Sequence, residues 1–581
     1  MLKLAILSVD DASFQIVLEL QDISLNIGTE EEPVCLLDGV TFRLKGGGQL
    51  VAVLGPSGCG KSTLIKTIAG LKEATSGKTL WKGRDLSDQD FEPREVGYVP
   101  QFSIAHEKLE VWECIEDAIR LRCAGLSGDE LSARVDGVLT EVGMLEIAEK
   151  RVEVLSGGQR RRLALGLELV SSPDLLLCDE VTSGLDPRAE DEITELMRAV
   201  ALKGRIVLNI THSLRHLAAH TSVIVLMRGR LVYHAPPEHL LFYFGVEHAE
   251  DLYPRLATRK PEEWAQSWEK RRNSYYDLEN ATPSQETQPV ATESESVGSV
   301  SWFAQMTVLL ARRWKLFWRD AGQVKLQLAL MLGFPCLVVI FALQGLPALR
   351  AAAELPDDPL KQLVADFAAK LEYLRVGGMV SGLIMFQVVL LTLMGANNAA
   401  REVAGERLIL EKEKFSGLSP SAFVFSRMLF LVALVCVQSV WMSLFVNAVV
   451  RMPGNLITQT LLLFLVNAAM TSISLGISAL MQTAEQSSLV SVYLVGFQLP
   501  LSGAVLALPE WLGKMTRPLI SSYWGWSGYL QTLQDTRFYN AVVSMTQTPL
   551  MSVSAVVWVL GFQILLGLTM AYVGVRGARW E

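Results

Sequence analysis

Short apolar runs alternate with amphipathic stretches through the first 245 residues, and charged residues are frequent throughout this part of the chain. This pattern predicts an α/β domain in which crossover helices cover a parallel sheet. The clearest predicted strands are Leu50–Leu54, Leu175–Asp179 and Arg205–Ile210. We therefore expect residues 1–245 to form one folded domain.

Beyond residue 300 the pattern changes to long apolar stretches that contain no Asp, Glu, Lys, Arg or His. Each is longer than the about 20 residues that a helix needs to cross the hydrocarbon core of a bilayer. The sequence therefore predicts an all-α domain of six transmembrane helices over residues 324–581. The stretches are 326–349, 376–400, 428–450, 452–484, 486–509 and 538–575, and the last can also hold an interfacial or re-entrant piece.

Two segments connect the domains. Residues 246–300 are expected to form a tail of the first domain and a flexible linker, because 281–300 are rich in Ser, Thr, Gln, Glu and Pro. Residues 301–323 mix Trp and Phe with Arg and Lys, which predicts a helix at the membrane interface. An ordinary amphipathic surface helix is the alternative. The aromatic residues of 510–537 are likewise expected at a membrane–water interface.

The composition supports insertion of part of the chain into lipid. Apolar residues make up 50% of the sequence and charged residues 19%. The net charge of −9 argues against nucleic acid as a partner. No histidine follows His248, which disfavours a transition-metal site in the membrane half.

A glycine-rich segment after the predicted strand Leu50–Leu54 matches G-x-x-x-x-G-K-[ST] and precedes a helical pattern. Its glycines let backbone N–H groups close around phosphates, and the helix presents its positive end. Lys61 is expected to neutralise the β- and γ-phosphates of ATP, and the Ser62 hydroxyl to bind Mg²⁺. The predicted ATP-binding residues of this loop are Gly55, Pro56, Ser57, Gly58, Cys59, Gly60, Lys61, Ser62 and Thr63. Cys59 either makes the site sensitive to thiol reagents or is a tolerated small side chain.

The predicted strand Leu175–Asp179 ends in two carboxylates, Asp179 and Glu180. The first can hold Mg²⁺ through water, and the second can orient or deprotonate an attacking water. A buried strand that ends in two solvated acids is the alternative, which a neighbouring phosphate loop disfavours.

The pentapeptide L-S-G-G-Q at Leu155–Gln159 resembles the signature of the ATP-binding cassette transporters. The resemblance implies that Gln101 reaches Mg²⁺ and contacts the membrane domain. It makes Ser183–Asp186 a loop that crosses a dimer interface, and His212 the switch histidine at the γ-phosphate. The implied residues are catalytic Glu180, His212 and Lys61; Mg²⁺ ligands Ser62, Gln101 and Asp179; and further ATP contacts Gln101, Ser156, Gly157, Gly158, Gln159 and Asp186.

Two positions depart from the family pattern. Val181 stands where the family usually has proline, which should alter the local turn and leave the chemistry intact. Leu25–Thr29 offers no aromatic side chain, whereas the family often stacks one on adenine. Base stacking is therefore expected to be weak or supplied elsewhere.

The order of cassette first and membrane domain second resembles the G subfamily, the white-type half-transporters with an ABC-2 type membrane domain. Gly405–Phe423 is similar to their first cytoplasmic loop, which docks on the cassette, and 301–320 to their connecting helix. The resemblance implies a dimer with ATP between the phosphate loop of one chain and the signature of the other. A homodimer is the economical reading, and a heterodimer is left open. External stretches without cysteines or N-x-[ST] sequons favour a bacterial relative.

These inferences predict a multi-pass protein of the cytoplasmic membrane, with the cassette and both termini in the cytosol. It is expected to export an apolar or amphipathic, lipid-like substrate at the cost of ATP. By resemblance, Phe386 and Phe497 are candidate substrate contacts, and lipid-facing or helix-packing roles are the alternative. Two other functions are left open: an importer, and a membrane-bound ATPase that regulates a partner protein.

Overall fold

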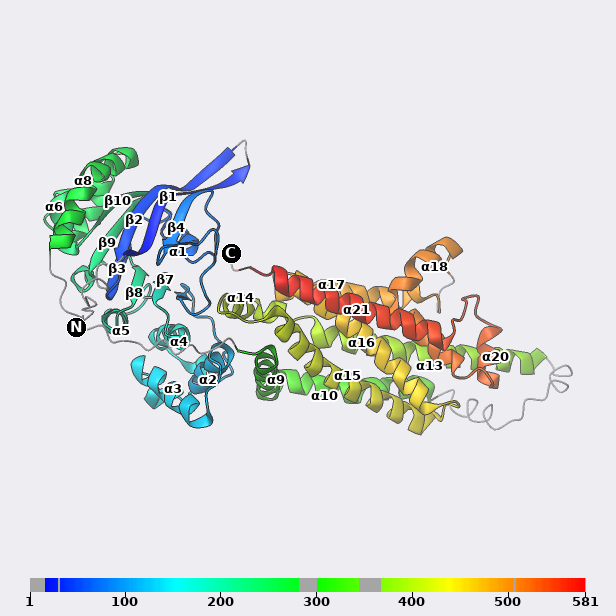
Figure 1. Cartoon of the computed structure of the whole chain (residues 1–581). Coiled ribbons are helices and arrows are strands. Elements are labelled where there is room, and N and C mark those ends of the chain that lie inside the picture. The colour runs from blue at the N-terminus through cyan, green and yellow to red at the C-terminus, as the bar shows by residue number, and fades with distance from the viewer. Residues whose placement is uncertain (1–15, 30–31, 282–299, 344–366, 505–507, 580–581) are drawn as a thin grey trace, which may run out of the picture. The chain divides into compact units, whose positions relative to one another are not determined.

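The computed structural model describes residues 16–29, 32–281, 300–343, 367–504 and 508–579. The chain divides into two compact units (Figure 1). The first comprises Met1–Ser301 with Phe415–Leu418 and Arg579–Glu581, and the second comprises Trp302–Lys414 and Ser419–Ala578. The predicted flexible linker at 281–300 lies, except for its two end residues, outside the described residues.

The first unit is built on a six-stranded sheet with strand order β10-β9-β3-β8-β7-β6 (Figure 1). All neighbours pair in parallel except β10, which is antiparallel to β9. Every residue of β7 and β8 is buried, as expected for parallel strands that are covered on both faces. The three predicted strands are confirmed. The strands are β3 (Gln49–Leu54), β6 (Val96–Val99), β7 (Leu175–Cys178), β8 (Ile206–Ile210), β9 (Ser222–Met227) and β10 (Arg230–Ala235).

A second, antiparallel sheet and a set of helices complete this α/β unit. The sheet has the order β2-β1-β4-β5, with β1 (Ile16–Thr29), β2 (Glu32–Lys45), β4 (Ser76–Trp81) and β5 (Arg84–Asp85). The helices are α1 (Lys61–Ile68), α2 (Val111–Arg122), α3 (Gly128–Glu141), α4 (Gly157–Leu169) and α5 (Pro187–Leu202). The predicted α/β fold class of the first half is therefore confirmed.

The apolar core of the first unit continues past residue 245. Helices α6 (Leu240–Phe244), α7 (Leu252–Leu256) and α8 (Pro261–Ala281) follow β10, and α8 packs on that strand. Tyr233 of β10 lies with its ring centroid 5.5 Å from that of Trp268, and both rings are buried. Beside them, His234 is fully buried and its Nδ1 lies 3.1 Å from the Tyr276 hydroxyl. The tail after residue 245 thus contributes to the same core as the sheet.

The second unit is helical, and its described residues include five helices long and apolar enough to cross a membrane. They are α10 (Ala321–Ala342), α13 (Phe367–Ala399), α15 (Pro420–Val450), α16 (Leu456–Leu480) and α21 (Val553–Gly577). They cover five of the six predicted spans. Shorter helices are α18 (Glu510–Thr516), α19 (Ser521–Gln531) and α20 (Arg537–Val543); α20 lies in the part of the last apolar stretch that precedes its span.

The remaining predicted span, 486–509, forms a shorter helix, α17 (Ala484–Gln498). At 1.5 Å per residue its 15 residues rise about 22 Å, less than the about 30 Å of a hydrocarbon core. The helix ends where Pro500 begins a 3₁₀ turn, because proline has no N–H for the helical ladder. Gly503, with φ of 74°, then turns the chain.

The aromatic residues of 510–537 differ from the prediction of an interfacial belt. Tyr523 and Trp526 of α19 are fully buried in the second unit, and only Trp511 is largely exposed. The Trp526 indole donates to Ser381 Oγ at 3.1 Å, so its polar atom is satisfied within the protein. α19 approaches its neighbours closely because Gly525 leaves room for Val466; a Cβ there would lie 2.3 Å from a methyl group of that valine.

The basic residues of α9 (Trp302–Arg319) are only partly at the surface. Arg312 and Arg313 are buried and donate paired hydrogen bonds to Glu413 and Glu402. Glu413 belongs to α14 (Arg407–Phe415). Arg427 of α15 is also buried and pairs with Glu402 and Glu406. The guanidinium groups therefore hold α9, α14 and α15 together. Only the exposed aromatic side chains of α9, among them Trp318, fit the predicted position at a membrane interface.

Glycines let α16 and α21 pack closely against each other in the second unit (Figure 1). A Cβ added to Gly567 would lie 2.3 Å from the backbone carbon of Ser472, and one added to Gly574 would lie 2.6 Å from that of Ala479. Only glycine allows helices to approach this closely, an arrangement common within membranes.

We expect Gly567→Ala to destabilise the helical unit by about 1–3 kcal/mol, because the new methyl group meets backbone that cannot move aside. Thermal unfolding in detergent, followed by loss of the monodisperse peak on size exclusion, measures this effect. Gly561→Ala on the same helix is the matched control, since a Cβ there meets nothing within 4 Å. Equal midpoints for the two variants would contradict the close packing.

Burial, helped by the nearby positive charge of Arg43, lowers the pKa of His234 to about 3. In the unfolded chain the histidine is protonated below about pH 6.5, whereas in the folded chain it is protonated only below about pH 3. The free energy of unfolding therefore falls as the pH falls through this window. We expect a loss of about 1.4 kcal/mol per pH unit below 6.5. Denaturant unfolding of the first unit at pH 7 and pH 5, read by tryptophan fluorescence, should show this slope and its reduction in His234→Gln. His248→Gln, at an exposed position, should keep it.

Candidate nucleotide-binding site

Four neighbouring parallel strands deliver the predicted site residues to one edge of the sheet. The phosphate loop follows β3, Gln101 follows β6, Asp179 follows β7, and His212 follows β8. Because parallel strands end at the same edge, residues far apart in sequence meet there. The sheet thus assembles the site before any ligand is considered.

The phosphate loop connects β3 to α1 through three glycines with positive φ: Gly55 (150°), Gly58 (75°) and Gly60 (103°). A Cβ at Gly55 would lie 2.4 Å from the carbonyl oxygen of Leu226, so no other residue fits. Gly60 precedes α1 and makes no side-chain cap, so the first N–H groups of that helix point into the loop without an intrahelical partner. This arrangement is an anion site of the kind that phosphates occupy.

Lys61 lies inside this loop. Its side chain is buried, and Nζ donates to the carbonyl oxygens of Gly55 at 2.9 Å and Pro56 at 3.0 Å. The ammonium charge is therefore held within the concavity that would receive phosphate. Neighbouring Cys59 is also buried, and burial raises the pKa of its thiol. A neutral, enclosed thiol fits the packing alternative better than a reactive one.

Asp179 sits between two hydroxyl groups. Ser62 Oγ donates to Asp179 Oδ1 at 2.8 Å, and the Tyr98 hydroxyl donates to Oδ2 at 3.1 Å. Burial raises the pKa of Asp179, while the hydrogen bonds from Ser62 and Tyr98 lower it. The interpretation of Asp179 as a freely solvated acid is therefore wrong, since the residue is buried and bonded at both oxygens.

The donor set at this point fits Mg²⁺, which prefers oxygen ligands and keeps several waters. The Ser62 hydroxyl, the Asp179 carboxylate and the amide oxygen of Gln101 are the residues that would hold it. Within the described ranges no group of three His, Cys, Asp or Glu side chains forms a dedicated metal cage. A cation here would therefore depend on phosphate and water oxygens for its remaining ligands.

Glu180 is held from two sides. Its Oε2 accepts from Gln101 Nε2 at 3.0 Å, and its Oε1 lies 3.0 Å from His212 Nε2. The backbone of Glu180 has φ of 52°, a left-handed conformation uncommon for residues with a side chain. Val181, in the place of the usual proline, is fully buried and so anchors this turn by packing.

The signature residues and Asp186 lie at the N-termini of two helices. Ser156 caps α4. Its Oγ accepts a hydrogen bond from Gln159 N at 3.3 Å, and Gln159 Oε1 accepts one from Ser156 N at 3.0 Å. Ser156 and Gly157 are exposed. Asp186 caps α5 by accepting from Ala189 N at 3.0 Å. These predicted ATP contacts thus present an exposed helix N-terminus. By contrast, Ser62 is hydrogen-bonded to Asp179, and Glu180 is bonded to Gln101 and His212.

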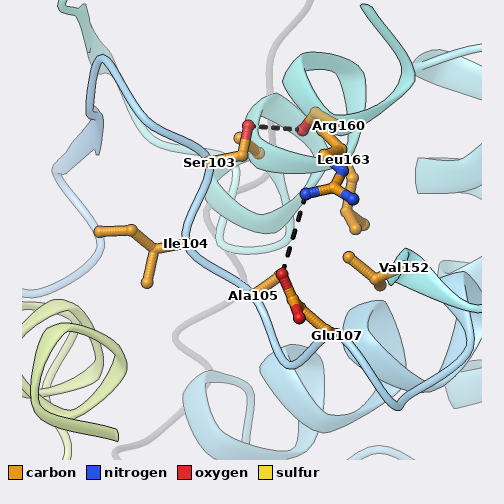
Figure 2. Close-up of a pocket in the computed structure, with 8 residues that line it drawn as sticks. Ser103, Ile104, Ala105, Glu107, Val152, Arg160 and Leu163 are labelled. Atoms are coloured by element: carbon orange, nitrogen blue, oxygen red, sulfur yellow. Dashed lines mark hydrogen bonds and ion pairs between the residues drawn. The ribbon is translucent and has the colours of Figure 1, made fainter. Parts of the chain in front are cut away.

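A small hollow lies between the segment after Gln101 and α4 (Figure 2). Ser103 Oγ donates to the carbonyl oxygen of Arg160, and the Arg160 guanidinium lies 3.9 Å from the Glu107 carboxylate. These links tie the Gln101 segment to the helix that carries the signature. The lining residues are Ser103, Ile104, Ala105, Glu107, Val152, Arg160, Leu163 and Ala164.

The two candidate substrate contacts belong to the second unit. Phe386 on α13 is partly buried, with its ring 5.0 Å from that of Phe341 on α10. Phe497 on α17 is 55% exposed. Their assignment to substrate stays a prediction. Sequence reasoning missed Tyr98, whose only signal was a polar group inside an otherwise apolar strand of four residues.

The strand-ended phosphate loop, the bonded Asp179 and the capped signature helix together define an ATP-binding cassette. Residues 37–183 match the family described as ABC transporter, and residues 304–530 match ABC-2 type transporter. The chain belongs to the ATP-binding cassette transporters and carries a membrane domain of the ABC-2 type.

Several relatives resemble all or part of the chain. The ABC transporter ATP-binding/permease protein Rv1747 of Mycobacterium tuberculosis is 27% identical over 94% of this chain and 61% of its own length. ABC transporter G family member 14 of Arabidopsis thaliana is 30% identical over 40% of this chain and 38% of its own. The methionine import ATP-binding protein MetN of Rhizobium johnstonii is 35% identical over 38% and 61%. The chain therefore spans about three fifths of the length of the first of these relatives.

Among solved structures, a dimeric ATP-binding cassette in a post-hydrolysis state with ADP and Pi is similar, with 25% identity and a TM-score of 0.35. It covers 38% of this chain, and the match includes 98% of that chain.

We expect Glu180→Gln to bind ATP with nearly unchanged affinity and to lose at least about 99% of steady-state hydrolysis. Glutamine keeps hydrogen bonds to Gln101 and His212 but cannot accept a proton from water. Phosphate release and binding of a fluorescent ATP analogue measure the two properties separately. Glu195→Gln, a change of an exposed glutamate, serves as the control. Near-normal turnover in Glu180→Gln would refute the assignment of Glu180 as general base.

Proposed function

We propose that this chain is an ATP-driven half-transporter that acts as a homodimer and exports an apolar or amphipathic, lipid-like substrate across the cytoplasmic membrane. The observation that carries the proposal is the combination, in one chain, of a hydrogen-bonded ATP-hydrolysing residue set and apolar spans without charge. ATP and Mg²⁺ are the cofactors that this set implies.

Each residue of the set has a role that its surroundings support. The phosphate loop binds the β- and γ-phosphates through backbone N–H groups, and Lys61 neutralises their charge. Glu180 accepts the proton of the attacking water, and His212, bonded to it, holds its orientation and reaches the γ-phosphate. Bound Mg²⁺ would withdraw charge from the phosphate oxygens. Ser62 and Asp179, which are hydrogen-bonded to each other, and Gln101 would hold such an ion through their side-chain oxygens.

Dimerisation completes the nucleotide site. In a single chain Ser156 caps α4, and both Ser156 and Gly157 are exposed. The N-terminus of α4, a helix of 13 residues, is an anion site that a second chain's ATP can use. Because every site residue is present in this chain, two copies make two complete sites. A heterodimer would also satisfy this geometry.

The membrane unit supports drive by ATP instead of by ions. The six apolar stretches contain no Asp, Glu, Lys, Arg or His, whereas proton and ion pathways need such groups at depth. Several basic side chains near the spans are engaged in ion pairs, as in Arg313 with Glu402. Free energy for uphill movement must therefore come from the cassette.

Four amide side chains within the spans bind one another. Gln438 of α15 accepts from Asn398 Nδ2 at 2.9 Å and from Asn467 Nδ2 at 3.1 Å, and it donates to Gln327 Oε1 at 3.0 Å. These four buried amides join α10, α13, α15 and α16. Amide groups satisfied in this way hold helices together and do not offer binding capacity to a polar solute. This supports an apolar substrate, with Phe386 and Phe497 as candidate contacts.

Cytoplasmic ion pairs supply a rigid element for coupling. Arg312 joins α9 to α14, and Arg427 joins α15 to Glu402 and Glu406 just before α14. Separating the two partners of a buried ion pair costs free energy, so α9, α14 and α15 move together. We infer that closure of the cassettes on ATP moves this block, including the Gly405–Phe423 loop, and reorients the spans.

Two alternatives remain as outcomes of experiment. An importer is supported by the similarity to the methionine import ATP-binding protein, which covers 38% of this chain. A membrane-bound ATPase that regulates a partner protein would hydrolyse ATP without moving a solute. The presence of spans and cassette in one chain favours transport over regulation of a partner protein, and the charge-free apolar stretches favour export of a lipid-like compound.

The proposal is tested with full-length protein in lipid nanodiscs and in sealed inside-out vesicles. We expect one fraction of bacterial envelope lipid to stimulate ATPase activity several-fold, because substrate bound by the spans promotes cassette closure. The same fraction, fluorescently labelled, should move to the lumen of inside-out vesicles only with ATP. Glu180→Gln is the matched control and should abolish both signals.

Other outcomes would decide against the proposal. ATP-dependent movement out of the lumen would make the protein an importer. Strong ATPase activity that no lipid or amphipathic compound alters, without movement of any labelled compound, would favour the partner-regulating ATPase.

A further inference from the structure

The Asp179 carboxylate has a second hydroxyl partner besides that of the phosphate loop. Ser62 donates to Oδ1 and Tyr98 donates to Oδ2, at 2.8 and 3.1 Å. Ser62 is a residue that would bind Mg²⁺. Tyr98 lies on β6 and has no role assigned so far. The two hydroxyls hold the carboxylate from opposite oxygens, so neither oxygen can turn without breaking a hydrogen bond.

The position of the Tyr98 hydroxyl is fixed by the sheet. Tyr98 pairs with Leu177 across β6 and β7, and the Asp179 N–H extends this ladder by donating to the Val99 carbonyl oxygen at 2.9 Å. The Tyr98 ring is 2% exposed within the apolar core of the unit. Backbone ladder and core packing together hold the hydroxyl at one place relative to Asp179.

The chemistry of the pair makes Tyr98 a donor. A phenol hydroxyl carries its proton at neutral pH, so the Tyr98 hydroxyl donates to Asp179 Oδ2. A hydrogen bond from a neutral hydroxyl to a buried carboxylate is among the stronger ones, because the acceptor is charged. It also compensates part of the cost of keeping Asp179 ionised beneath the phosphate loop.

We propose that Tyr98 is a positioning residue for metal-bound nucleotide: by anchoring Asp179 Oδ2, it leaves Oδ1 and the Ser62 hydroxyl facing the Mg²⁺ position. This inference rests on the proposed function as a Mg²⁺-dependent ATPase. Without the hydroxyl, Asp179 rotates about its terminal torsion, which has broad minima, and the Mg²⁺ position loses a fixed oxygen. A purely structural tyrosine, by contrast, affects stability and leaves the metal dependence unchanged.

The test uses Tyr98→Phe, which removes one oxygen and keeps the ring in the core. Full-length protein in nanodiscs carries Glu180→Gln so that bound nucleotide is not hydrolysed. Binding of a fluorescent ATP analogue is titrated in EDTA and then at increasing Mg²⁺ concentration. We expect unchanged affinity in EDTA, within about twofold, and a rise of about tenfold or more in the Mg²⁺ concentration for half-maximal effect.

Tyr233→Phe in the same background is the matched control. Tyr233 is also a fully buried strand tyrosine, and its hydroxyl donates to the Pro236 carbonyl oxygen at 2.8 Å, within a cluster of aromatic rings beside α8. It should lower the unfolding temperature as much as Tyr98→Phe and leave the Mg²⁺ dependence unaltered. A second check is Asp179→Asn, in which Tyr98→Phe should add no further change, because the two residues act through one hydrogen bond.

Several results would overturn the inference. An unaltered Mg²⁺ dependence in Tyr98→Phe would show that the tyrosine does not position the metal. Equal weakening in EDTA and in Mg²⁺, with a lower unfolding temperature, would show a structural role only. If the parent protein itself gains no affinity from Mg²⁺, the proposed function falls first and the inference with it, and the two failures are thereby distinguished.

Discussion

The parallel pairing of β6, β7, β8 and β3 is the constraint on which the nucleotide site depends. These strands end at one edge, and the residues just beyond their ends are those that carry the chemistry. Gln101 and Glu180 are bonded only because the strands before them are hydrogen-bonded neighbours. A slip in this register would separate all of the reacting groups at once.

How far the sequence predicts this site depends on whether its residues are contiguous. The phosphate loop could be recognised because its glycines, lysine and serine stand in one run, and Asp179 and Glu180 because they end an apolar strand. Tyr98 could not be found in this way, since its partner lies 81 residues away and only the sheet brings them together. The capping role of Ser156 is local and follows from its position before a helix.

The membrane half shows the same division between local and distant causes. Hydropathy predicts five of the spans, because burial in lipid is a property of each segment alone. It does not predict the early end of α17, nor the burial of Tyr523 and Trp526, which depends on glycines that let α19 approach its neighbours. Nor does it show that the basic residues of α9 pair with carboxylates from a distant loop, as Arg313 does with Glu402.

Lys414, near the end of α14, connects two elements that the chain separates by more than a hundred residues. Its ammonium group donates hydrogen bonds to the carbonyl oxygens of Val575, Arg576 and Ala578 at the C-terminal end of α21. These three bonds fix the position of the Lys414 side chain. A positive charge there also balances the negative end of the helix dipole. Helices α14 and α21 are thus held together by hydrogen bonds. The glycine contacts between α21 and α16 pass a displacement of α21 on to α16. The last turn of α21 therefore cannot shift without breaking its hydrogen bonds to Lys414, so a displacement of α14 within the helical unit would carry α21 with it.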